Sequence, residues 1–140
     1  MTNLIEELKK EHRIMLDALS EVKKLGISSS TARERLLSTK NLLIAHITKE
    51  DEQYYSALRK AAENDKALKV MLDYFSEDMK AVSEKAMHFF EKYSQGGDET
   101  EFEGDIILFC MMLMDRISAE EKNLFRRFDP PSSKNPVPAR

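Results

Sequence analysis

The chain has 140 residues, of which 41% are hydrophobic and 34% charged, and its formal net charge is −3. This length suits a single domain with a substantial core, and the low content of glycine and proline, four of each, is typical of a helical protein. Charges of both signs alternate along the sequence, so no basic surface is expected for nucleic acid or for an anionic membrane.

The location of the protein is predicted from its cysteine content and its N-terminus. Cys110 is the single cysteine and has no internal disulfide partner. The first residues lack the basic and apolar regions of a signal peptide, and the longest apolar stretch, residues 106–114, is too short to cross a bilayer. We therefore expect a cytoplasmic protein.

Four amphipathic helices are predicted from hydrophobic periodicity and capping signals. In chain order, the first begins with the pair Asn3 and Glu6 and stops at Gly26; the second begins with Thr31 and Glu34; the third follows Glu63-Asn64-Asp65 and stops at Gln95-Gly96-Gly97; the fourth begins with Thr100 and Glu103. Short connections between such helices favour an up-down-up-down antiparallel four-helix bundle. We expect this bundle over residues 1–128, followed by a flexible proline-rich tail over residues 129–140.

Each helix has a row of residues at three- and four-residue spacing that should face the core. These rows are Ile5, Leu8, His12, Met15, Leu19 and Val22; Leu36, Thr39, Leu43, His46, Glu50, Gln53 or Tyr54, Ala57 and Ala61; Leu68, Leu72, Phe75, Met79, Val82, Ala86, Phe89 and Tyr93; and Phe102, Ile106, Phe109, Leu113, Arg116, Glu120 and Leu124 or Arg127. Three of the rows contain polar residues near their middle, where burial is costly.

The depths of these polar residues agree with one another. Counting residues from the helix ends, at about 1.5 Å per residue, places six side chains in one layer of the bundle: His12, His46, Glu50, Met79, Arg116 and Glu120. Buried polar groups cost several kcal/mol each unless they are paired or bind a metal. The layer is therefore the candidate site.

Two imidazoles and two carboxylates converging from three helices suit a divalent ion such as iron, manganese or zinc. We predict His12, His46, Glu50 and Glu120 as its ligands. Considered alone, His12 would more often be a hydrogen-bonded core residue than a metal ligand. The alignment of His12 with the other three residues favours the metal site. The third histidine, His88, lies about half a turn out of phase and is expected on the surface.

Other residues are expected to have ordinary roles. Cys110 and the methionines at 111, 112 and 114 are expected to pack in the core. The charged groups Glu7-Lys10-Glu11 and Lys49-Asp51-Glu52 are expected to form solvated faces, and Tyr55 and Phe90 to be exposed.

At this point the sequence resembles the hemerythrin-like, or HHE, cation-binding domains, over roughly residues 3 to 128. The matching phrases are Glu11-His12 in the first helix, His46-Ile47-Thr48-Lys49-Glu50 followed by Tyr54-Tyr55 and Leu58 in the second, and Arg116-Ile117-Ser118-Ala119-Glu120 followed by Leu124-Phe125 in the fourth. Two positions differ, because Met79 and Arg116 stand where the family has histidines.

The resemblance implies a four-helix bundle with a non-haem di-iron centre, used for oxygen binding, for iron or oxygen sensing, or for handling nitric oxide damage. In the family, one iron is held by the first two histidines, the other by the last two, and the carboxylates bridge both. The resemblance thus implies that His12, His46, Glu50 and Glu120 keep one half-site, and that Met79 and Arg116 delete the other. Reversible oxygen binding by two irons is not expected here.

The leading hypothesis is a protein with one divalent metal per chain, non-haem iron above others, that acts in metal, oxygen or redox sensing with oxygen or another small diatomic molecule as its ligand. A second hypothesis is a metal-free interaction or regulatory module in which Arg116 pairs with Glu50 and Glu120. A third is an iron-dependent enzyme, ranked last because the sequence reveals no substrate pocket.

Overall fold

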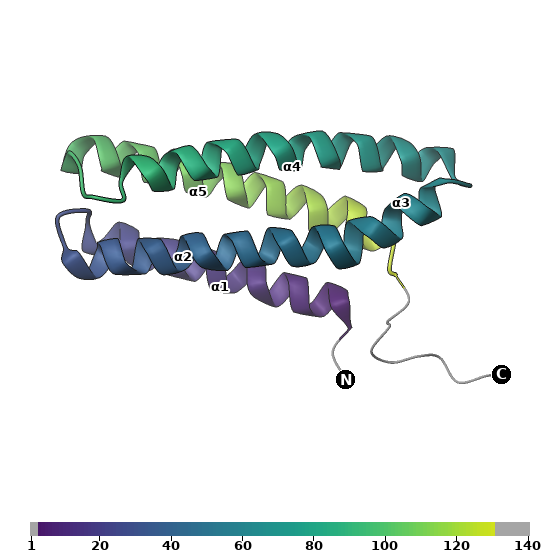
Figure 1. Cartoon of the computed structure of the whole chain (residues 1–140), viewed down its shortest axis with the longest axis horizontal. Helices are drawn as coiled ribbons and strands as arrows, with labels where there is room; N and C mark the ends of the chain where they lie inside the picture. The colour runs from purple at the N-terminus through teal and green to yellow at the C-terminus, as the bar shows by residue number, and fades with distance from the viewer. Residues whose placement is uncertain (1–2, 131–140) are drawn as a thin grey trace.

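The computed structural model describes residues 3–130, and within this range every regular element is helical (Figure 1). The elements are α1 (Leu4–Leu25), α2 (Ser30–Lys49), η1 (Glu50–Tyr55), α3 (Ser56–Ala62), α4 (Lys66–Lys92), α5 (Glu99–Ala119), η2 (Glu120–Leu124) and α6 (Phe125–Arg127). No helix of the described part is long and apolar enough to cross a membrane.

The elements form the expected bundle of four long helices. The backbone stays right-handed helical through residues 49–56 and 119–125, so α2, η1 and α3 make one continuous helix, and α5, η2 and α6 make another. α1 packs against α2 and α5, and α4 packs against α5, α2 and α3 (Figure 1). Successive helices run in opposite directions, which confirms the up-down-up-down prediction.

Side-chain caps fix the helix starts. Asn3 accepts the N–H of Glu6 at 2.8 Å, as predicted, and Asp65 accepts the N–H of Leu68 at 3.1 Å. The predicted caps of the second and fourth helices, Thr31 and Thr100, each lie two residues after the observed caps. The caps there are Ser29 and Asp98. Their side-chain oxygens accept hydrogen bonds from the backbone N–H groups of Ala32 and Glu101.

The polar layer divides the core into two apolar clusters. One lies towards the α1–α2 and α4–α5 connections and is centred on Leu19, Ala86 and Ile106. The other lies at the opposite end, around Leu8, Tyr54 and Leu124. These clusters stabilise the bundle on both sides of the layer, so the layer's geometry is fixed by apolar packing above and below it.

Two π-helical turns change which residues face the core. η1 begins at Glu50 and η2 at Glu120, and a π turn holds more residues than an α turn. The face that was predicted to include Ala57 and Ala61 is therefore shifted by one residue, and the buried residues are Leu58 and Ala62.

Other side chains also differ from the sequence prediction. Tyr54 and Tyr55 are both buried, so the expectation that Tyr55 is exposed was wrong, and Phe90 is buried as well. Met111 and Met114 are exposed and do not pack in the core, whereas Met112 does pack against it. Of the predicted tail, residues 131–140 lie outside the described part.

Candidate metal centre

Four side chains meet in the middle of the bundle. His12 comes from α1, His46 from α2, Glu50 from the start of η1 and Glu120 from the start of η2, and all four are buried. One nitrogen or oxygen atom of each lies within 4.8 Å of the others. The closest pairs join His12 Nε2 to Glu120 Oε1, at 3.2 Å, and His46 Nε2 to Glu50 Oε2, at 3.4 Å. The structure thus brings together all four of the predicted ligand residues.

Each histidine is oriented by a carboxylate outside the layer. His12 Nδ1 lies 2.6 Å from Glu121 Oε2, and His46 Nδ1 lies 2.7 Å from Glu11 Oε1. Because an ionised carboxylate only accepts hydrogen bonds, each Nδ1 is the donor. In the neutral imidazole the lone pair then lies on Nε2, which faces the layer, and this arrangement is typical of metal-binding histidines.

Glu11 and Glu121 were not recognised from the sequence as part of the site. From the sequence, Glu11 and Lys49 are expected on two separate solvated faces, but in the structure Lys49 Nζ lies 2.8 Å from Glu11 Oε2 and 2.8 Å from Glu7 Oε1, and Glu11 also contacts His46. Helical spacing places a side chain on its own helix and does not tell which neighbouring helix it reaches. The available signal was adjacency, because each of these acids directly neighbours a layer residue, His12 or Glu120.

Arg116 occupies the other half of the layer beside Met79. Its Nη2 donates to Glu120 Oε2 at 3.0 Å and to the hydroxyl oxygen of Tyr55 at 2.8 Å. Its Nη1 donates to the carbonyl oxygen of Phe75 and to Asp78 Oδ2, both at 3.1 Å. The guanidinium is thus held by four oxygen acceptors and lies 4.0 Å from Glu50 Oε1.

The two buried carboxylates have opposite electrostatic environments. Burial, and then the charge of Glu120, raise the pKa of Glu50 to about 7. Burial opposes ionisation of Glu120 as well, but the contact with His12 and the charge of Arg116 lower its pKa to about 2. Glu120 is therefore ionised near neutrality, whereas Glu50, with a pKa of about 7, is only partly ionised there.

The pKa of His46 is also shifted from its ordinary value. Burial alone would lower the pKa of His46, but the contact with Glu50, the charge of that carboxylate and the contact with Glu11 outweigh burial and raise it. Burial and the charge of Glu120 raise the pKa of Tyr55 far above its usual range, so its hydroxyl keeps its proton and donates to Glu120 Oε2 at 3.1 Å.

The residues fit a single metal ion. Glu50 Oε2 is buried without a hydrogen-bond partner in the structure, although it faces the Nε2 atoms of His46 and His12, the latter at 3.9 Å. Two ligands on opposite sides of one ion are about 4.2 Å apart, so a spread of 4.8 Å needs only a small contraction. A cavity of about 30 Å³ lies among these side chains, large enough for one small ion or a water molecule.

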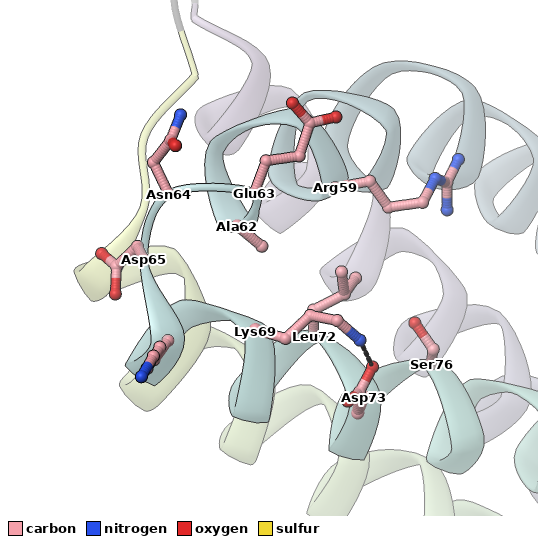
Figure 2. A pocket seen from close by; sticks show the side chains of 10 residues that line it. Arg59, Ala62, Glu63, Asn64, Asp65, Lys69, Leu72, Asp73 and Ser76 are labelled. Atoms are coloured by element: carbon pink, nitrogen blue, oxygen red, sulfur yellow. Dashed lines mark hydrogen bonds and ion pairs between the residues drawn. The ribbon is translucent and has the colours of Figure 1, made fainter.

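A larger cleft lies elsewhere on the surface. It holds about 720 Å³ between α3 and the start of α4, and Figure 2 shows its floor at Ala62 and Leu72. Charges of both signs line its rim, with Lys69 Nζ 2.7 Å from Asp73 Oδ1. It shares no lining residue with the polar layer, and its chemistry is that of a mixed surface.

Two further sequence predictions can be placed. His88 is exposed on α4, as its phase indicated. Cys110 is half-buried against the apolar core, and burial raises the pKa of its thiol, which agrees with a packing role.

Comparison with known protein families matched residues 3–128 to the family described as "Hemerythrin HHE cation binding domain". Comparison with curated proteins gave no match, and neither did comparison with solved structures. The family match spans the whole bundle and includes every residue of the polar layer. The chain therefore belongs to the hemerythrin HHE cation-binding domain family, and its His/Glu cluster lies where a metal cation can be held.

Proposed function

We propose that this protein binds one divalent metal ion per chain through His12, His46, Glu50 and Glu120, with non-haem iron as the metal, and that it acts in metal, oxygen or redox sensing. The observation that carries the proposal is the orientation of both imidazoles. Each Nδ1 is held by an outer carboxylate, so both Nε2 atoms face the buried oxygen of Glu50 that has no hydrogen-bond partner.

Arg116 supports a single ion. A guanidinium is a permanent cation, and at 3.0 Å from Glu120 it stands where a second metal would otherwise share that carboxylate. A second cation beside it would be repelled in a low-dielectric layer. Arg116 and Met79 thus replace one half of a two-metal centre, and the remaining half keeps two nitrogen and two carboxylate donors.

Sensing fits the shape of the site better than turnover of an organic substrate. The cavity at the layer holds about 30 Å³, which admits an ion, a water or a diatomic molecule. A neighbouring pocket of about 160 Å³ between α1 and α2 reaches His46 beside Glu11 and Lys49, and it offers a route for such small species. Iron bound here would supply redox chemistry and an affinity for diatomic ligands.

The second candidate is the metal-free interaction module. The observation that favours it is the complete set of acceptors around Arg116, which satisfies a buried charge without any metal. In that case the layer stabilises one bundle geometry, and the outer faces of the helices carry the function.

Elemental analysis of protein purified without chelators tests the proposal. We expect about one iron per chain in the wild type, loss of that iron in His46→Ala, and retention of helical circular dichroism in the variant because the apolar clusters are unchanged. His88→Ala is the matched control, since it removes an exposed histidine far from the layer and should keep its metal. No metal in the wild type after iron is offered, or equal metal in both variants, would contradict the proposal; two metals per chain would contradict the single-ion site.

A further inference from the structure

One oxygen of Glu120 is occupied by two donors that are not part of the His/Glu cluster. Its Oε2 accepts a hydrogen bond from Arg116 Nη2 at 3.0 Å and another from the Tyr55 hydroxyl at 3.1 Å. A carboxylate oxygen has about two lone-pair positions, so these two donors fill both of them. The other oxygen, Oε1, lies 3.2 Å from His12 Nε2, on the side of the cluster.

The two donors also hold each other. Arg116 Nη2 donates to the Tyr55 oxygen at 2.8 Å, so guanidinium, hydroxyl and carboxylate form a closed ring of three hydrogen bonds. Burial and the charge of Glu120 raise the pKa of Tyr55, so the hydroxyl keeps the proton that it donates. All three side chains are buried, and solvent therefore competes little for these bonds.

The π turn gives the polar layer this hydroxyl. η1 spans Glu50–Tyr55, and the backbone repeat of a π turn is five residues, where that of an α turn is four. Tyr55 is the fifth residue after Glu50 and is buried like it. The irregular turn thus brings a neutral donor beside the two buried carboxylates.

We propose that Tyr55 is a specificity-determining residue of the metal centre. Together with Arg116 it occupies Oε2 of Glu120, so that this carboxylate offers a metal Oε1 alone and cannot be shared between two ions. The inference rests on the proposed function, because it concerns the same cluster. Tyr55 acts by filling the lone pairs of the shared carboxylate, whereas Arg116 also repels a second cation by its charge.

Replacing Arg116 alone therefore does not free Glu120. In the double variant Met79→His with Arg116→His, the Tyr55 hydroxyl can still donate to Oε2 and must be displaced before a second ion uses that oxygen. Tyr55→Phe removes the hydroxyl and keeps the buried ring. Added to the double variant, it should raise the affinity for the second ion about 10-fold, the effect expected from one competing hydrogen bond. Titration with Fe²⁺ in the absence of oxygen, against a chromophoric chelator, measures both binding steps.

The neighbouring tyrosine supplies the matched control. The Tyr54 hydroxyl donates to the backbone carbonyl oxygens of Leu124 and Phe128, at 3.2 and 2.7 Å. Tyr54→Phe in the same double variant also removes a buried hydroxyl, and it should leave the affinity for the second ion unchanged. Helical circular dichroism checks that the variants fold.

The binding of the second ion decides the proposal. Equal affinity with and without the Tyr55 hydroxyl, including no second ion in either variant, would overturn it. A visible absorption band that appears when the iron is oxidised in the double variant and is lost with Tyr55→Phe would overturn it as well, because Tyr55 would then be a ligand. If the wild type binds one iron and Tyr55→Phe has no effect on the second ion, this inference alone fails; a wild type without iron contradicts the proposed function.

A stability measurement in chelator tests the same contact without metal. Because Tyr55 and Arg116 bond to each other and to one oxygen, the losses in urea midpoint caused by Tyr55→Phe and Arg116→Met should not be additive in the combined variant. Tyr54→Phe combined with Arg116→Met should give additive losses. Additive losses for Tyr55 as well would show that it does not act on Glu120 together with Arg116, and would overturn the proposal.

Discussion

Arg116 Nη2 lies 3.0 Å from Oε2 of Glu120, one helical turn further along the chain, while Oε1 of the same carboxylate lies 3.2 Å from His12 Nε2. One buried carboxylate is therefore divided between a permanent cation and an imidazole that belongs to the candidate metal cluster. His12 and the guanidinium together lower the pKa of Glu120 and keep it ionised. Glu50, which has no such contact closer than 4.0 Å, is the carboxylate whose charge depends on what occupies the layer.

Removing the guanidinium should destabilise the metal-free protein. Arg116→Met leaves Glu120 and Asp78 without their cation, and breaking a buried ion pair from one side costs about 3–5 kcal/mol. We expect a loss of that size in the free energy of unfolding, measured with urea in the presence of chelator. The control is Arg35→Met, which breaks an exposed pair with Glu21 and should cost less than about 1 kcal/mol. Equal losses in the two variants would show that the Arg116 network has no special structural role.

The outer carboxylates should affect metal affinity without being ligands. Glu121→Gln and Glu11→Gln remove the charge that orients His12 and His46, and such contacts are typically worth about 10- to 100-fold in affinity. Competition with a chromophoric chelator measures the change. Glu52→Gln, an exposed acid on η1, should leave affinity unchanged. If all three variants bind metal as the wild type does, the outer carboxylates do not orient the ligands.

Restoring both histidines should open a second metal position. Met79 and Arg116 lie side by side, with Arg116 Nη2 3.8 Å from Met79 Sδ, so histidines at both positions would face Glu50 and Glu120 from the other side. We expect about two metal ions per chain by elemental analysis for the double variant Met79→His with Arg116→His. Arg116→His alone supplies one new ligand and should bind the second ion more weakly. A double variant that still binds one ion, or none, would contradict the inference that Arg116 fills a vacated metal position.

Most of the bundle follows from local sequence patterns. The inward row of α1, from Ile5 to Val22, is buried as its spacing predicts, because it contains no irregular turn. The depth of the polar layer was also predictable, since the connections are short and helix length converts directly into height. Arg116 and Glu120 therefore meet His12 and His46 as counted from the helix ends.

The π turns and the contacts between helices were not predictable in this way. A π turn at Glu50 shifts every later position, so the residue buried is Leu58 and the one predicted was Ala57. Within this turn Tyr54 and Tyr55 are both buried, and the Tyr54 hydroxyl donates to the Phe128 carbonyl at 2.7 Å. Spacing along one helix also does not reveal that Glu11 reaches across to His46.

The pH dependence of stability should separate the two candidate functions. Without metal, the pKa of Glu50 is raised from 4.5 to about 7 and that of His46 is raised above 6.5. The folded protein then holds protons more tightly than the unfolded chain. The stabilisation from Glu50 is fully present below about pH 4.5 and that from His46 below about pH 6.5, and each is lost as the pH rises through the folded value. The metal-free protein should therefore melt at lower temperature as the solution becomes more alkaline.

Bound metal reverses this dependence, because the ion requires neutral imidazoles and an ionised Glu50, and protons compete with it. Thermal melts between about pH 5 and 8.5, with iron and with chelator, make the comparison. With iron, we expect the melting temperature to fall towards acid; with chelator, it should fall towards alkaline pH. In His46→Ala, where a ligand is missing, iron and chelator should give the same curve. A wild type whose curve is identical with and without chelator, and declines towards alkaline pH, would exclude the metal site and favour the module in which Arg116 alone balances the buried carboxylates.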